Sequence, residues 1–166
     1  MNEYEKPEQE DEGFVKNELE KLRAINDREC ESLATFLQSH IDEIYRLLIE
    51  RNKGSADFEG LCEVAAEELH KRLKAAGYDS KMVEGDLVVG EKDSLSHMIN
   101  MVKFPNHWVL IDLTIRQLPW YKNKSWLLEA LPPDNAEIKK FLYDRYNWWL
   151  GPNHDYKREP FVNCKS

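Results

Sequence analysis

Two short β-like runs on either side of a proline constrain the fold of this chain more than any other feature. They are SHMINMV, residues 96–102, and HWVLIDLT, residues 107–114. Short runs rich in apolar residues and bounded by turn residues are typical of paired strands. If residues 103–106 form a four-residue loop built on a type I turn, Val102 pairs with His107 in an antiparallel hairpin.

Helical periodicity surrounds this β region. Apolar residues recur at intervals of three and four, as expected of helices that bury one face, in residues 14–22, 33–49, about 60–76 and 134–149. Gly77 predicts a left-handed stop for the third helix, and Asp134 with Glu137 can form the capping box of the last. Two further β segments, divided by glycines, are expected near residues 81–83 and 86–89. Helices, then a small antiparallel sheet, then a helix together predict an α+β fold.

The length and composition predict one domain with an acidic tail. A chain of 166 residues with 42% hydrophobic content can bury a substantial core. Residues 1–12 carry six acidic side chains and little that is apolar, so we expect this tail to be disordered. The single domain is then residues 13–166, made of a helical N-terminal part (13–53), a central core (about 55–120) and a helical C-terminal part (121–166).

The charge and hydropathy of the chain exclude several classes of partner. The formal net charge of −8 disfavours nucleic acids and anionic lipids, because phosphate contacts require clustered Lys and Arg side chains. No stretch has the uncharged apolar length of a membrane span, and the acidic N-terminus lacks the features of a signal peptide. We therefore expect a cytoplasmic protein that binds neither nucleic acid nor membrane. A delivered effector or toxin would share these properties.

The cysteines point to reduced thiols. Cys30, Cys62 and Cys164 are odd in number and have no CxxC spacing, which argues against a disulfide framework and against a cysteine-rich zinc site. Cys62 lies at the start of the third predicted helix. There the partial positive charge of the helix N-terminus favours the thiolate, and the Cys62 N–H can supply half of an oxyanion hole.

His97 and Asp112 fall on the two strands of the predicted hairpin. In the predicted register they lie directly opposite each other, with Cβ atoms roughly 5 Å apart. Asp112 would accept the proton of His97 Nδ1 and leave Nε2 to face outward, whereas a one-residue slip would put the two on opposite faces. His107 is the alternative base, but side-chain alternation points it away from Asp112 on the same strand. Cys62, His97 and Asp112 are therefore the expected nucleophile, base and orienting carboxylate, converging at one crevice.

The residues that carry this pattern also resemble a known family. They are Gly60-Leu61-Cys62, Ala65-Ala66, Leu69, Leu73, Ala76-Gly77, Gly85, Ser96-His97, Trp108 to Thr114 and Gln117. Together they look like the transglutaminase-like branch of the papain-like superfamily, over about residues 57–117. The resemblance implies a papain-like fold in which the cysteine opens a helix packed on an antiparallel sheet, with the histidine on one strand and the aspartate on the next. Members hydrolyse peptide bonds, deamidate or cross-link glutamine side chains, or transfer acyl groups.

These observations predict a cysteine-dependent hydrolase or acyltransferase that acts on amide bonds of a protein or peptide, through a thioester intermediate and without a metal or cofactor. Trp108 shares a strand face with Asp112 and could line the acyl pocket. The second oxyanion donor stays open, with Asn52, Gln38 and Gln117 as candidates.

Two other hypotheses compete with the enzyme. The first is a catalytically inactive papain-like protein that serves as a binding module and keeps the three residues as packing. The second is a partner-binding module formed by the helices of residues 14–50. We also expect three further histidines to lie on the surface, namely His40, His70 and His154.

Overall fold

The fold is an α+β arrangement, which confirms the fold class predicted from the sequence. The computed structural model describes residues 19–25, 27–52, 61–88, 94–115, 127–146 and 148–149. Residues 19–23 are helical, and the longer helices are α2 (Arg28–Arg51), α3 (Cys62–Ala75) and α4 (Asn135–Tyr146). The strands are β1 (Ser80–Val88), β2 (Ser94–Lys103), β3 (Trp108–Asp112), β4 (Leu127–Leu131) and β5 (Trp148–Trp149), and they form one antiparallel sheet in the order β4-β3-β2-β1-β5. The expectations for residues 1–12, Gln117, His154 and Cys164 lie outside the described residues.

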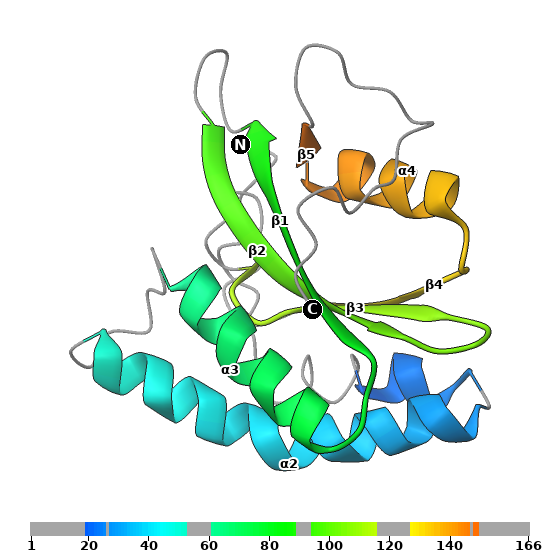
Figure 1. Cartoon of the computed structure of the whole chain (residues 1–166), viewed down its shortest axis with the longest axis horizontal. Coiled ribbons are helices and arrows are strands. Elements are labelled where there is room, and N and C mark those ends of the chain that lie inside the picture. The colour runs from blue at the N-terminus through cyan, green and yellow to red at the C-terminus, as the bar shows by residue number, and fades with distance from the viewer. Residues whose placement is uncertain are drawn as a thin grey trace, which may run out of the picture.

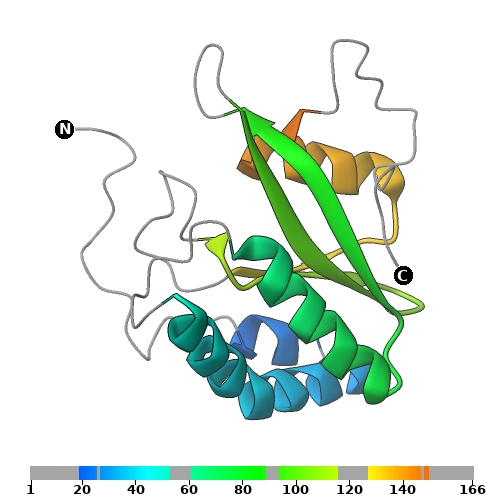
Figure 2. The same ribbon diagram turned by 60° about the vertical axis from the view of Figure 1, so that its left-hand side comes forward.

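The sheet separates two groups of helices. Helices α2 and α3 cover one face, and α4 lies on the other side (Figure 1, Figure 2). The main core lies between α2, α3 and the sheet, and its buried members include Leu33, Leu37, Ile44, Leu69, Leu73, Val102, Val109 and Ile111. Among the described helices, none combines the length and the apolar character that crossing a membrane requires.

Helix α2 starts earlier than the apolar period predicts. Its N-cap is Asp27, whose Oδ1 accepts the Glu29 N–H over 2.8 Å. Cys30 follows in the first turn and is fully buried. The prediction began at Leu33 because the first turn is mostly charged, so the cap rather than the hydrophobic pattern sets the start.

Helix α3 ends as the sequence predicts. Gly77 has a φ of 91°, in the left-handed region that side chains rarely adopt, and the Tyr78 N–H donates to the Leu73 carbonyl over 3.0 Å. This reversal sends the chain directly into β1.

Strand β1 is one continuous strand rather than two short segments divided by glycine, so that expectation was wrong. It pairs with β2 from Ser80↔Val102 to Val88↔Ser94, and Gly85 lies within it, buried and opposite His97. Continuous pairing with a long neighbour holds Gly85 in the strand despite its low strand propensity.

The hairpin between β2 and β3 has a different register from the predicted one. Val102 pairs with Val109 and Lys103 with Trp108, and the turn is closed by a bond of 2.8 Å from the Phe104 N–H to the His107 carbonyl. The observed register differs from the predicted one by two residues. The same side chains therefore share a face of the sheet as predicted, although the individual residue pairs differ. Burial explains the choice, because Val102 and Val109 are both fully buried, whereas the predicted register would set the partly exposed His107 against Val102.

The C-terminal part is not simply helical, which corrects the prediction for residues 121–166. Residues 127–131 form β4 against β3, and residues 148–149 form β5 against β1, so the helical period does not continue to Trp149. Leucine, glutamate and alanine favour helices, but the free edge of β3 offers pairing that overrides this weak preference. The predicted start of the helix is confirmed, since Asp134 Oδ1 accepts the Glu137 N–H over 3.0 Å.

Two of the histidines expected on the surface are at least partly buried. His70 is buried, and its Nδ1 hydrogen-bonds with the Ser80 hydroxyl over 2.8 Å, joining α3 to β1. His40 is partly exposed and stacks on Phe36 at 4.2 Å between ring centroids. Charged neighbours in the sequence predicted exposure, but helical periodicity turns His70 toward the sheet.

Candidate active site

The centre of the candidate site is a buried pair of His97 and Asp112. His97 Nε2 lies 2.7 Å from Asp112 Oδ2, and the side chains of both residues are fully buried. The other carboxylate oxygen of Asp112 accepts the Thr114 N–H over 3.0 Å. Both oxygens of the carboxylate are therefore held, which fixes the plane of Asp112 and, through it, the imidazole ring.

The nitrogen that faces Asp112 differs from the expected one. The predicted hairpin directs Nδ1 to the carboxylate, whereas in the structure Nε2 faces Asp112 and Nδ1 is the remaining nitrogen. The observed register accounts for this. One further step beyond the pair Asn100↔Ile111 would set Asp112 opposite Ile99, so His97 meets Asp112 diagonally rather than directly across the strands. Such diagonal neighbours are farther apart at Cβ, and the more distant ring nitrogen spans that gap.

Cys62 is the first residue of α3 and the third member of the site. It packs against Ala66 and Met98, is partly exposed, and lies near enough to His97 to raise the pKa of the imidazole, although the buried His97 Nδ1 makes no hydrogen bond of normal geometry with the described residues. The N–H groups of the first helical turn have no intrahelical acceptors and carry partial positive charge. Cys62 is therefore partly exposed, whereas His97 and Asp112 are buried.

The three residues meet beside the end of β3 rather than over the middle of the sheet. Met98 packs on Ala66, and Asn100 Nδ2 donates to the Ala66 carbonyl over 2.9 Å, so these β2 side chains face α3. Because side chains alternate along a strand, the side chain of His97 leaves β2 on the face of the sheet opposite to α3. The end of β3 lies beside the N-terminus of α3 in both views (Figure 1, Figure 2). The pairing of β2 with β3 ends at Asn100↔Ile111, so His97 lies beyond the paired part of β2 that faces β3.

The surroundings favour the protonated form of His97. Burial by itself lowers the pKa of the imidazole, but the charge of Asp112 and its hydrogen bond outweigh burial. With smaller contributions from the hydrogen bond and charge of Cys62, they raise the pKa of His97 from 6.5 to about 10. His97 is therefore an imidazolium at neutral pH, and its positive charge lies near Cys62.

The structure does not bring the other predicted site residues to these three. Trp108 is at the hairpin end of β3, about 13 Å along the strand from Asp112 at a rise of ~3.3 Å per residue, and Lys103 Nζ lies 5.7 Å from the centre of its ring. Asn52 is the C-cap of α2, and Gln38 accepts a hydrogen bond of 2.8 Å from Arg23. His107 lies beside Asp27, in a cluster that does not include Cys62.

Three residues near the site were given no role in it by the sequence. Asn100 anchors α3 to β2, Thr114 holds Asp112, and Gly85 lies opposite His97 without a side chain. Of the three, Asn100 could have been recognised in the sequence, because an amide in an otherwise apolar strand is expected to be buried and to need a hydrogen-bond partner.

The described residues contain one group of three His, Cys, Asp or Glu side chains whose ligand atoms all lie within 4.8 Å of one another. It consists of Asp27, Cys30 and His107 and does not include the candidate triad. A metal is therefore better accommodated near the start of α2 than at Cys62.

No family model, curated protein or solved structure matches this chain. The resemblance to the transglutaminase-like family over residues 57–117 stays a prediction.

Proposed function

We propose that this protein is a cysteine-dependent hydrolase or acyltransferase acting on amide bonds, with a papain-like fold of the transglutaminase-like type. The observation that carries the proposal is the buried hydrogen-bonded pair of His97 and Asp112, with the partly exposed Cys62 near enough to raise the pKa of His97. A nucleophile, a base that contacts it and a group that orients the base are the three parts that nucleophilic catalysis requires.

The proposed reaction starts from the thiolate and the imidazolium. The Cys62 sulfur attacks the carbonyl carbon of a peptide bond or a glutamine side chain, and a C–S bond forms. The proton on His97 Nδ1 moves to the departing amine or ammonia as the C–N bond breaks, which leaves a thioester. His97, now neutral, takes a proton from water or from an acceptor amine, which attacks the thioester and releases the thiolate. Asp112 stays anionic and holds the ring throughout.

Alkylation by iodoacetamide tests the nucleophile directly, because only the thiolate reacts at an appreciable rate. At neutral pH, peptide mapping by mass spectrometry should show Cys62 modified well before Cys30, which is fully buried. Replacement of His97 by Gln should slow the labelling of Cys62. The matched control is His40→Gln, which changes a partly exposed histidine on α2 and should leave the rate unchanged. Equal, slow labelling of Cys62 in the wild type and in His97→Gln would contradict the proposal.

Substrate turnover is the second test. Protein mixtures incubated with the wild type and with Cys62→Ser are compared by mass spectrometry for cleaved chains, deamidated glutamine and glutamine–lysine cross-links. Products that depend on Cys62 would identify both the bond attacked and the acceptor.

A binding module without catalysis is the second candidate. It is favoured by one observation, namely that the imidazole of His97 has no exposed surface. This alternative predicts that Cys62 labels slowly and that the Asp112–His97 pair affects stability alone.

A further inference from the structure

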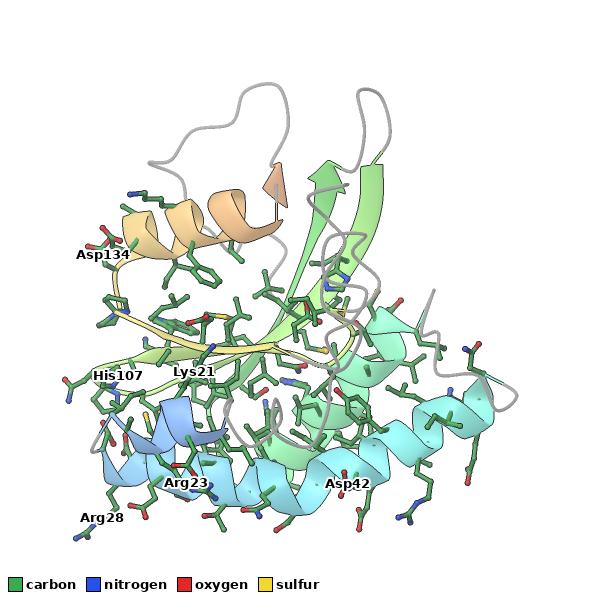
Figure 3. The ribbon with its side chains drawn as sticks, turned by 180° about the vertical axis from the view of Figure 1, so that it is seen from behind. Lys21, Arg23, Arg28, Asp42, His107 and Asp134 are labelled. Atoms are coloured by element: carbon green, nitrogen blue, oxygen red, sulfur yellow. The ribbon has the colours of Figure 1, made fainter. Side chains whose placement is uncertain are left out.

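A second cluster of chemically reactive side chains lies at the start of α2, apart from the candidate triad. It consists of Asp27, the N-cap of α2, Cys30 in the first turn, and His107, the last residue before β3. One ligand atom from each lies within 4.8 Å of the other two. Figure 3 shows His107 at the hairpin end of the sheet, above the end of α2 where Arg28 is labelled. Residues far apart in the sequence therefore bring a carboxylate, a thiol and an imidazole together.

The imidazole of His107 points a buried nitrogen into this cluster. Nδ1 is shielded from solvent, and within the described part of the chain no hydrogen-bond partner satisfies it. The nearest carboxylate oxygen, Asp27 Oδ2, lies 3.6 Å away, which is beyond a normal hydrogen bond. Two atoms bound to one tetrahedral zinc ion are about 3.3 Å apart for nitrogen and oxygen, given bonds of about 2.0 Å. The observed separation is thus close to that of two ligands of one ion.

The remaining atoms of the cluster suit this arrangement. Asp27 uses Oδ1 to cap α2, so Oδ2 is the oxygen directed at His107. Cys30 is fully buried and forms no disulfide. Burial, followed by the charges of Asp27 and Glu29, raises the pKa of the Cys30 thiol to about 11. A bound cation would offset these negative charges and bind the thiolate after the proton leaves.

We propose that Asp27 Oδ2, Cys30 Sγ and His107 Nδ1 bind one divalent transition-metal ion, with Zn²⁺ as the first choice. Sulfur, nitrogen and oxygen ligands together suit zinc, whereas Mg²⁺ and Ca²⁺ prefer oxygen alone. Three protein ligands leave a fourth position for water. The ion would pin the turn between β2 and β3 to the start of α2, and it would do so independently of the proposed catalytic activity.

Cobalt provides the direct test, because a Co²⁺–thiolate bond gives a near-ultraviolet charge-transfer absorption that a carboxylate or imidazole does not. The metal-free full-length protein, with its thiols reduced, is titrated with Co²⁺, and bound Co²⁺ is then displaced with Zn²⁺. We expect one equivalent to bind, the absorption to be absent in Cys30→Ser, and the absorption to be retained in Cys62→Ser.

The His107→Gln variant tests the second ligand, with His40→Gln as its matched control. Loss of an outer-shell partner of a metal ligand costs about 10- to 100-fold in affinity, so loss of a ligand should weaken Zn²⁺ binding by at least ~100-fold. Zn²⁺ should raise the melting temperature of the wild type and of His40→Gln, but not of His107→Gln. Circular dichroism of the metal-free variants confirms that each is folded.

Two results would overturn the site. One is the absence of any thiolate absorption in the wild type, and the other is an absorption that disappears in Cys62→Ser but persists in Cys30→Ser. Neither result bears on whether Cys62 is a nucleophile, since alkylation of the metal-free protein measures that separately.

Discussion

Replacing Asp112 by Asn changes one atom and should disable His97 as a base. The Asp112 carboxylate accepts from His97 Nε2 over 2.7 Å and from the Thr114 N–H over 3.0 Å. Asparagine has one oxygen for these two donors, and its amide nitrogen can only donate. If the oxygen stays on Thr114, the amide faces Nε2, which must then accept. The proton moves to Nδ1, the nitrogen left for Cys62, and a protonated Nδ1 on a neutral ring cannot take up the thiol proton.

The size of the effect follows from the proton affinity of His97. Its pKa of about 10, against an ordinary 6.5, corresponds to roughly 5 kcal/mol of preference for the protonated ring, because a tenfold change in affinity is worth about 1.4 kcal/mol. Asp112 is the main cause of the increase, and without its charge burial lowers the pKa of His97. The ring then becomes neutral at pH 7. We expect the alkylation rate of Cys62 to fall by about 10- to 30-fold, because an ordinary thiol of pKa about 8.5 is still ~3% thiolate at pH 7.

The assay is the rate of carboxymethylation at pH 7, followed by intact-protein mass spectrometry, with urea unfolding measured in parallel. Asp79→Asn is the control, since Asp79 is exposed and faces only Lys81, at 3.6 Å. Loss of one partner of a buried pair costs up to about 3–5 kcal/mol of stability, so the variant is assayed where circular dichroism shows it folded. A folded Asp112→Asn protein that labels at the wild-type rate would refute the role assigned to Asp112.

Three other properties can be measured on the same protein. The free energy of unfolding should fall as the pH rises from 6.5 through 10, because His97 holds its proton more tightly in the folded protein than in the unfolded chain. The stabilisation is complete below pH 6.5 and is lost above the folded pKa of about 10. Urea midpoints in this range that match those of His97→Gln would contradict this. Gly77→Ala should cost about 1 kcal/mol in urea unfolding, purely from the φ of 91°, since an added Cβ would meet no atom within 4 Å, and Gly77→Asn should cost less. Asn100→Ala should lower the free energy of unfolding by about 1–2 kcal/mol by removing the bond to the Ala66 carbonyl, and it should change the alkylation rate of Cys62. An unchanged alkylation rate in this variant would show that the anchor does not position the helix.

The sequence was sufficient to predict that His97 and Asp112 share a face, but not how they contact each other. Sharing a face depends only on the parity of the hairpin, and a shift of two residues preserves parity. The contact itself depends on the register, which is decided by the burial of Val102 and Val109 and by the turn at Phe104. These are tertiary effects, and loop length alone could not separate the two registers.

The C-terminal region shows the same limit in secondary structure. Residues 127–131 have helix-favouring side chains and become a strand because β3 would otherwise expose its edge. By contrast, the end of α3 and the start of α4 were predictable, since Gly77 and Asp134 act through bonds between residues at most five positions apart. Local chemistry could therefore be predicted from the sequence, and pairing between distant segments could not.

Burial of the His97–Asp112 pair is easier to explain by chemistry than by stability. The pair lies on a sheet whose buried neighbours include Ile99, Met101 and Leu110. A buried ion pair commonly contributes no more than well-packed apolar residues of the same size would, because desolvation of the charges offsets their attraction. Apolar side chains at both positions would then give the fold about the same stability. Apolar residues cannot hold a proton near the sulfur of Cys62 and keep that proton available. The burial of two ionisable groups is therefore better explained by proton transfer with the nearby thiol than by a contribution to the stability of the core.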